Sequence, residues 1–220
     1  MQKEIVALVA VKGTSERIKK KNTRPFHNTN LLELKLSQLK KVKGFHEIIV
    51  SSEDSGILET ARKKGVNVHI RDPKYSTSFL PPSELFSYIA SEISGEHIAW
   101  VNVTNPLFES NAYDKAIEAY NNLDSKYNCL TSVYEVKNNL FYKGRPINFQ
   151  ANPWPRSQDL EGVCAMSHAI NIMRREEMIP LGSYLGSSPY FFYMDSISSL
   201  DIDYQIDFDF CEMIYKKRHS

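Results

Sequence analysis

The run I-V-A-L-V-A-V, Ile5 to Val11, is the stretch that decides the fold class. It is apolar at every position and is closed by Gly13, which is typical of a strand buried on both faces of a parallel sheet. Short β-rich runs then alternate with helical patterns along the 220 residues. This alternation predicts an α/β fold of βαβ units. We expect a three-layer sandwich around a mainly parallel sheet, formed by one domain over residues 1–220.

Working outward from that run, the pattern places the other elements. Strands are expected at 46–52, 66–71, 97–104, 130–136, 163–173 and 190–194, and helices at 31–39, 54–65, 84–93, 111–123 and 206–217. Residues 72–83 are rich in Ser, Thr and Pro and predict a loop, whereas 138–160 are polar, Pro-rich and aromatic and predict an arm that leaves the core. Because open parallel sheets bind ligands at the carboxyl ends of their strands, the site should follow Val11, Val50, Val103 and Leu200.

Composition excludes several classes of protein. The 27 basic and 26 acidic residues nearly cancel, so no nucleic-acid partner is expected. The first apolar run is too short for a signal peptide, and no stretch approaches the roughly 20 apolar residues of a membrane span. The three cysteines are scattered and form neither a disulfide framework nor a zinc motif. A cytoplasmic protein without a membrane partner is therefore expected.

The first strand leads into a basic loop, K-G-T-S-E-R-I-K-K-K-N, from Lys12 to Asn22. A small-residue turn at Gly13 and Ser15, followed by Arg17 and Lys21, can offer backbone N–H groups and cations to a triphosphate. The spacing is neither that of a Walker A loop nor that of a dinucleotide fingerprint. A solvated basic loop without a ligand is the alternative.

The second feature is the late segment D-I-D-Y-Q-I-D, Asp201 to Asp207. In an extended chain Asp201 and Asp203 lie on one face, and two neighbouring carboxylates favour a hard cation such as Mg²⁺. Alternatively, Asp203 or Asp207 serves only to cap the last helix.

A third feature is the polar segment that holds Arg156 and Gln158 after an aromatic–proline bend. The pair could form a fork for a carboxylate or phosphate. The alternatives are an exposed loop, or a contact between subunits.

Together, and in this order, these segments resemble the acylneuraminate cytidylyltransferase family and its relatives that activate 3-deoxy-octulosonate sugars. The resemblance covers nearly the whole chain and implies a Rossmann-like nucleotidyltransferase fold. The matching motifs are the loop Lys12–Asn22, the strand end Ser51–Asp54, Arg71, the turn Asn102–Phe108, Arg156–Leu160 and Asp201–Asp207.

The resemblance implies a reaction in which a sugar hydroxyl attacks the α-phosphorus of CTP and pyrophosphate leaves. Catalysis then consists of positioning and charge neutralisation, with Lys21 and Asp203 as the catalytic residues. It also implies three sets of ligand contacts: the nucleotide at Lys12, Gly13, Ser15, Arg17, Asn22, Arg71 and Thr104, Mg²⁺ at Asp201 and Asp203, and the small acidic acceptor at Arg156, Gln158, Ser167 and His168.

The chain departs from the family pattern at several positions. Lys12 and Phe108 replace arginines, and Glu16 replaces a lysine near the phosphates. In the acceptor half, Ala165 and His168 stand among residues that replace a tyrosine, an arginine and an N-G-A run. His168 is either a substituted ligand contact or a histidine packed on a strand.

Three hypotheses follow from these departures. The first is CTP-dependent transfer to a nonulosonic or octulosonic acid, and the second is transfer to another acid, such as a phosphonate or a phosphorylated molecule. The third is a non-catalytic nucleotide-binding relative. The resemblance also implies that the arm at 138–160 reaches a second subunit in a homodimer, since its aromatics would be unfavourable in water. Alternatively, these aromatics fold back on their own domain.

Overall fold

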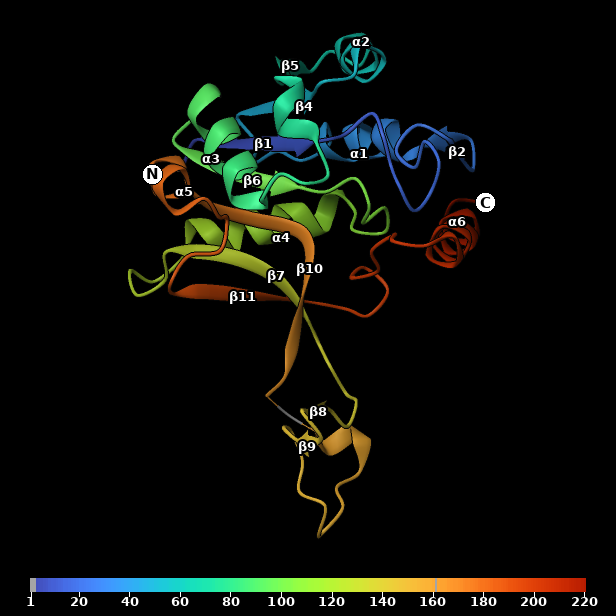
Figure 1. Cartoon of the computed structure of the whole chain (residues 1–220), viewed down its shortest axis with the longest axis vertical. Coiled ribbons are helices and arrows are strands. Elements are labelled where there is room, and N and C mark those ends of the chain that lie inside the picture. Colours follow the sequence, from blue (N-terminus) through green and yellow to red (C-terminus); the bar gives the residue numbers. More distant parts are fainter. Residues whose placement is uncertain (1–2, 161) are drawn as a thin grey trace.

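The computed structural model describes residues 3–160 and 162–220. Its centre is a seven-stranded sheet with the order β11-β7-β10-β6-β1-β4-β5 (Figure 1). The strands are β1 (Ile5–Ala10), β4 (Glu47–Ser52), β5 (Asn67–Ile70), β6 (His97–Val101), β7 (Cys129–Glu135), β10 (Cys164–Arg174) and β11 (Pro189–Met194). The prediction of a mainly parallel sheet is confirmed, because only β10 runs antiparallel to its two neighbours, β6 and β7.

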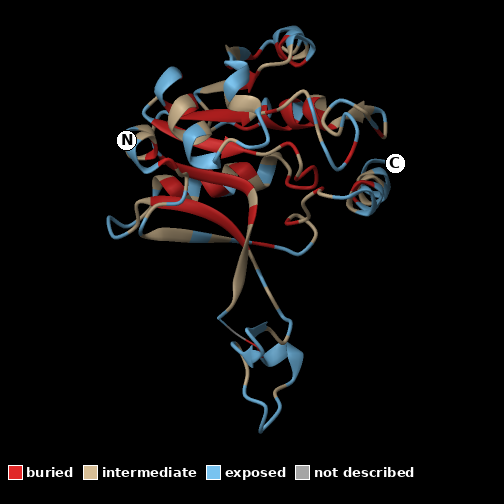
Figure 2. Ribbon diagram, viewed as in Figure 1, coloured by how far each residue is buried: buried red, intermediate tan, exposed pale blue. Residues whose placement is uncertain are grey.

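Helices cover both faces of this sheet, as predicted for three layers. Alternate side chains of β1 point to opposite faces: Ile5, Ala7 and Val9 join one buried cluster, while Val6 and Leu8 join the other. The first cluster is covered by α1 (Leu31–Leu39), α2 (Ser55–Lys63), α4 (Ser110–Asn121) and α6 (Gln205–His219), and the second by α3 (Pro82–Glu92) and α5 (Arg175–Leu181). Figure 2 shows the buried residues concentrated in the sheet.

Two short hairpins and two 3₁₀ turns are the remaining elements among the described residues. These are β2 (Pro25–Phe26) with β3 (Thr29–Asn30), β8 (Phe141–Tyr142) with β9 (Arg145–Pro146), η1 (Pro73–Ser76) and η2 (Ser157–Asp159). The arm at 138–160 carries β8, β9 and η2, and it projects away from the sheet as a mostly exposed segment (Figures 1 and 2).

Two expectations about local structure need correction. Residues 72–83 are not a continuous loop, because they contain η1 and the first turn of α3, which starts at Pro82 where a proline is compatible with a helix start. The sequence pattern did not predict the helix α5, because its seven residues are too few to show a helical period and include Pro180. Over the described ranges, no helix is long and apolar enough to cross a membrane.

Candidate functional site

The basic loop after β1 is held in place by its own backbone and one buried side chain. Ile18 is buried in the core, and its carbonyl accepts the N–H of Lys21 at 3.1 Å. The side-chain amide of Asn22 reaches back to the carbonyl of Lys12 at 3.2 Å. Ser15 is half-buried within the turn. The loop therefore has a defined shape at the carboxyl end of a central strand, where the fold rule places ligands.

Gly13 is required by close packing at the start of this loop. Its N–H donates to Glu53 Oε1 at 2.8 Å, and an added Cβ would lie 2.5 Å from Asp54 Oδ2. No side chain fits there without displacing Asp54.

The basic loop and the late acidic segment converge, although they are 181 residues apart in the chain. The ammonium of Lys21 donates to the carbonyl of Ile202 at 2.6 Å, and Arg17 forms an ion pair with Asp203 at 2.7 Å. Figure 1 shows the loop after β1 and the segment before α6 on the same side of the molecule. Two cations and two carboxylates are thereby placed together at the carboxyl end of the sheet.

The three aspartates of the segment Asp201–Asp207 have different structural roles. Asp207 accepts the backbone N–H groups of Asp203 and Tyr204 at 3.0 and 2.7 Å, so Asp207 is the residue that closes the start of α6. Between the two remaining acids, Ile202 is buried in the core and its N–H is held by the carbonyl of Thr104 at 2.9 Å. The carboxylates of Asp201 and Asp203 are therefore not used for capping.

Asp201 is the more buried of the pair. Burial raises its pKa, a hydrogen bond from Thr104 lowers it, and the charge of Asp203 raises it again. Its Oδ1 is buried and has no hydrogen-bond partner among the described residues. Such an oxygen needs a donor or a cation, because an unpaired buried acceptor is unfavourable.

Lys21 and Arg17 respond to the same charges. Burial lowers the pKa of Lys21, while Asp201 and Asp203 oppose that shift. Arg17 is exposed, and its guanidinium also lies over the ring of Tyr204, 5.4 Å from the centroid. The cluster is thus a balanced group of charges rather than an anionic patch.

These residues fit a magnesium ion bound together with phosphates. Within 3–160 and 162–220 there is no group of three or more His, Cys, Asp or Glu that could hold a metal. Two carboxylates completed by phosphate oxygens are, however, the usual protein contribution to a Mg²⁺ site. The orphaned oxygen of Asp201 is the observation that favours such an ion.

Arg71 is buried against the start of the basic loop and is not exposed on its surface. It is 1% exposed, and its Nη2 donates to the Val11 carbonyl and to Glu53 Oε2, both at 2.6 Å. Burial acts to raise the pKa of Glu53, but the bonds from Arg71, Gly13 and Ser76 outweigh it and hold that pKa below its usual value. Arg71 therefore supports the loop through Glu53, a partner that the sequence pattern did not identify.

Lys12 meets the segment that follows β5. Its ammonium donates to the carbonyl of Thr77 at 3.2 Å, and Ser78 donates to Glu16. The charge reversal at Glu16 thus has a local role in joining two loops.

Ser167 and His168 lie at an irregularity of β10, where the pairing with β7 shifts between Met166 and Asn171. Ser167 is buried and donates to Met194 Sδ at 2.9 Å, so its hydroxyl is used in the core. His168 has a left-handed φ of 61° and is hydrogen-bonded through Nδ1 to the Tyr184 hydroxyl at 2.8 Å. It also contributes to the electrostatic environment of Asp201.

Arg156 and Gln158 lie in the projecting arm, away from the cluster (Figure 1). Arg156 is exposed and forms a two-bond ion pair with Asp159, at 2.7 and 2.9 Å. Gln158 is exposed in η2. A single chain therefore does not bring these two residues to the acidic pair.

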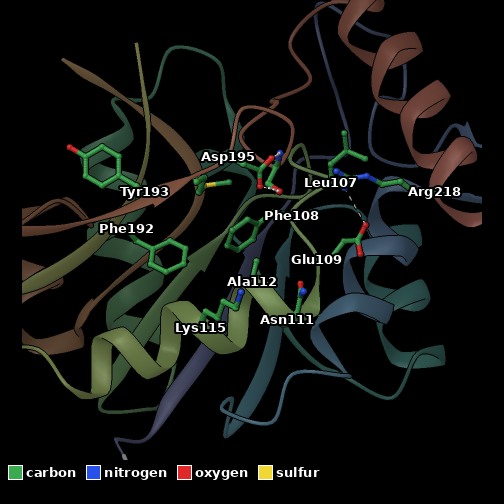
Figure 3. Close-up of a pocket in the computed structure, with 12 residues that line it drawn as sticks. Leu107, Phe108, Glu109, Asn111, Ala112, Lys115, Phe192, Tyr193, Asp195 and Arg218 are labelled. Carbon is green, nitrogen blue, oxygen red and sulfur yellow. Dashed lines mark hydrogen bonds and ion pairs between the residues drawn. The ribbon is translucent and has the colours of Figure 1, made fainter. Parts of the chain in front are cut away.

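A separate hollow of about 340 Å³ lies between the amino end of α4, β11 and the end of α6 (Figure 3). Phe108, Phe192 and Leu107 provide apolar walls, while Arg218 forms an ion pair with Glu109 at 3.5 Å. None of the residues predicted for the nucleotide, the metal or the acceptor lines this hollow.

The chain is similar to known proteins over nearly its whole length. The sequence profile described as cytidylyltransferase matches residues 6–219. A post-translational flagellin modification protein B of Campylobacter coli is 22% identical, over 98% of this chain and 97% of that protein. A CMP-N,N'-diacetyllegionaminic acid synthase of Campylobacter jejuni is 25% identical, over 96% of this chain and 94% of that protein.

Among solved structures, a CMP:2-keto-3-deoxy-manno-octonic acid synthetase complexed with CTP shares the fold. Its TM-score is 0.72, with 11% identity, and the match covers 98% of this chain and 99% of that one. The predicted Rossmann-like nucleotidyltransferase architecture is thereby confirmed.

Proposed function

The chain belongs to the cytidylyltransferase family, and from this premise we propose that it transfers a cytidylyl group from CTP to a small acidic sugar. The acceptor is a nonulosonic or 3-deoxy-octulosonic acid, and the products are its CMP derivative and pyrophosphate. The names of a legionaminic acid synthase and of an octonic acid synthetase among the similar proteins support this acceptor class. Synthesis of surface polysaccharides or other glycans would use such a product.

The observation that carries the proposal is the convergence of Lys21 and Arg17 with Asp201 and Asp203. Transfer of a nucleotidyl group needs little covalent chemistry from the protein, because positioning and charge neutralisation supply most of the catalysis. The acceptor oxygen forms a bond to the α-phosphorus, the bond to the bridging oxygen breaks, and a base takes the hydroxyl proton. Lys21 is placed to stabilise charge on the phosphate oxygens, and Gly13, Ser15 and the loop backbone to bind them.

Asp201 and Asp203 would hold Mg²⁺ together with the triphosphate. The ion supplies neutralisation of phosphate charge when it is bound. Binding of the ion by Asp203 would compete with its ion pair to Arg17, whose guanidinium would then be available to the phosphates. Arg71 and Asn22 act on the nucleotide through the shape of the loop, and Thr104 through its bond to Asp201.

Pyrophosphate release tests the proposal. The purified chain is incubated with CTP, Mg²⁺ and each member of a panel of 2-keto-3-deoxy sugar acids, and parallel reactions contain phosphonates and phosphorylated acceptors. Turnover with a sugar acid supports the proposal. Turnover only with another acid would reassign the acceptor. Binding of CTP in calorimetry without any turnover would leave a non-catalytic nucleotide-binding relative, and failure to bind CTP would refute the proposal.

The residues of the acceptor half of the site favour a second candidate function, in which the acceptor is an acid other than a sugar acid. Ser167 donates its hydroxyl into the core, and His168 is hydrogen-bonded to Tyr184. This stretch therefore lacks the arginine that the sugar-acid pattern has here. A phosphonate or phosphorylated acceptor would rely on Lys21 and Arg17 instead.

We also propose a cytoplasmic homodimer in which the arm at 138–160 contacts a second subunit. Phe141, Tyr142 and Trp154 are 60–63% exposed, although Phe149 packs between Phe141 and Trp154. Exposed aromatic clusters of this kind favour an interface. All three cysteines are free thiols, which suits a reducing compartment. A purely monomeric species in light scattering at micromolar concentration would contradict the dimer.

A further inference from the structure

Lys35 is a buried cation in the middle of α1, outside every motif described above. Its side chain is 0% exposed. The ammonium donates to the carbonyls of Asn105 at 2.8 Å and Phe108 at 3.3 Å, and to the hydroxyl of Tyr113 at 2.8 Å. All three donor positions of the ammonium are therefore used by oxygen acceptors.

The segment that Lys35 holds is joined directly to the acidic pair. The side-chain amide of Asn105 donates to the carbonyl of Leu200 at 3.0 Å, one residue before Asp201. It also donates to the carbonyl of Ser167 at 3.1 Å. The preceding residue, Thr104, accepts the N–H of Ile202 at 2.9 Å and bonds to the carboxylate of Asp201. Both sides of Asp201 are thus attached to residues 104–105.

A second bond from α1 reaches the same segment. Gln38, one turn after Lys35, donates its Nε2 to the carbonyl of Pro106 at 2.7 Å. The turn from Asn105 to Phe108 is therefore held at three of its four carbonyls by side chains of one helix. Since the helix is rigid, this turn has little freedom to shift.

Stability alone does not explain a lysine at this position. Lysine is almost never fully buried unless it is paired, and the desolvation cost of a buried charge often offsets most of what its contacts contribute. Burial lowers the pKa of Lys35 to about 7, while Glu109 and Asp201 oppose that shift. The buried ammonium of Lys35 is explained if its hydrogen bonds fix the geometry of the turn Asn105–Phe108, which an apolar side chain could not do.

Resting on the proposed function, we propose that Lys35 is a positioning residue for the metal–nucleotide site. It holds the turn Asn105–Phe108 so that Thr104 and Asn105 keep Asp201 in the orientation that binds a divalent ion with the triphosphate. Outer partners of metal ligands commonly change metal affinity by about 10–100-fold when they are removed.

The test is metal binding rather than turnover. Free Mn²⁺, an oxygen-seeking substitute for Mg²⁺, is measured by electron paramagnetic resonance with the full chain and CTP but no acceptor. Lys35→Met should weaken Mn²⁺ binding about tenfold. Lys40→Met is the matched control, because Lys40 is the exposed residue that caps the carboxyl end of α1 and its ammonium donates to the carbonyl of Lys64, away from the turn. This control should bind Mn²⁺ as the wild type does.

Tyr113→Phe provides a second variant in case Lys35→Met folds poorly. It removes one acceptor of the ammonium and leaves both loop carbonyls in place, so a smaller loss is expected. Added to Lys35→Met, it should have almost no further effect, since the two residues act through one contact. Unchanged Mn²⁺ affinity in Lys35→Met or in a folded Tyr113→Phe, with only a lower melting temperature, would overturn the positioning role.

Failure of the proposed function would look different. If the wild type binds Mn²⁺ with CTP but turns over no acid, the acceptor assignment fails and the Lys35 comparison still decides the inference. If the wild type itself binds no Mn²⁺ with CTP, both the metal site and the inference are wrong.

Discussion

Replacing Gly13 by alanine should destabilise the fold through one identified collision. The new methyl carbon would lie 2.5 Å from Asp54 Oδ2 and 2.7 Å from Asp54 Cβ. Asp54 cannot yield freely, because its Oδ1 caps α2 by accepting the N–H of Ile57 at 2.9 Å. The substitution therefore strains the loop and also displaces the carboxylate that caps the helix.

The magnitude follows from those two terms. Overpacking costs about 1–3 kcal/mol and loss of a helix cap costs about 1 kcal/mol. A glycine-to-alanine change restores about 0.4–1 kcal/mol through the unfolded chain. We expect Gly13→Ala to lower the free energy of unfolding by about 2–3 kcal/mol, and the melting temperature by about 4–12 °C for a chain of this size.

Urea unfolding of a double-mutant cycle measures the collision itself. Asp54→Gly removes both the carboxylate and the Cβ that the new methyl carbon would meet. Alone it should cost only a few tenths of a kcal/mol, because glycine is tolerated at a helix N-cap. In Gly13→Ala/Asp54→Gly the methyl group has room, so the pair should cost little more than Asp54→Gly alone. A coupling energy of about 2 kcal/mol is therefore expected. If the two costs simply add within about 0.5 kcal/mol, the methyl group does not meet Asp54 and the reasoning is wrong.

Three further outcomes are expected. Asp203→Asn should reduce metal-dependent turnover about 100-fold with the fold intact, whereas Asp209→Asn on the exposed side of α6 should leave it unchanged; equal rates in both variants would refute the metal role. Lys21→Ala should raise the CTP Michaelis constant or lower turnover, whereas Lys19→Ala, which removes an exposed cation of the same loop, should do neither. Equal Michaelis constants and turnover in the two variants would contradict the phosphate role of Lys21. The third concerns pH: Lys35 has a pKa of about 7 when folded and an ordinary value of 10.5, so the unfolded chain binds more protons between these values. The stability of the wild type relative to Lys35→Met should therefore rise from pH 7 toward 10 in chemical denaturation, and a constant difference would show that Lys35 keeps its ordinary pKa.

The spatial meeting of the two functional segments could be predicted before any coordinates. Lys21 follows the first strand, and Asp201 and Asp203 follow the last one, so a parallel sheet brings both to its carboxyl edge. The acceptor residues could not be placed in this way. Arg156 lies in an arm whose direction depends on packing, and its guanidinium is taken by Asp159.

The sequence by itself determined the elements and the kind of site, because strand and helix periods and turn residues are properties of near neighbours. Seven strands of the main sheet, the five helices of nine or more residues, and the basic and acidic segments could all be located from such local patterns. Only the tertiary structure decided which of three similar acids caps α6, that Arg71 turns inward to Glu53, and that Lys35 is buried. These outcomes depend on contacts between residues far apart in the chain, and burial is a property of everything that packs around a side chain rather than of its neighbours in sequence.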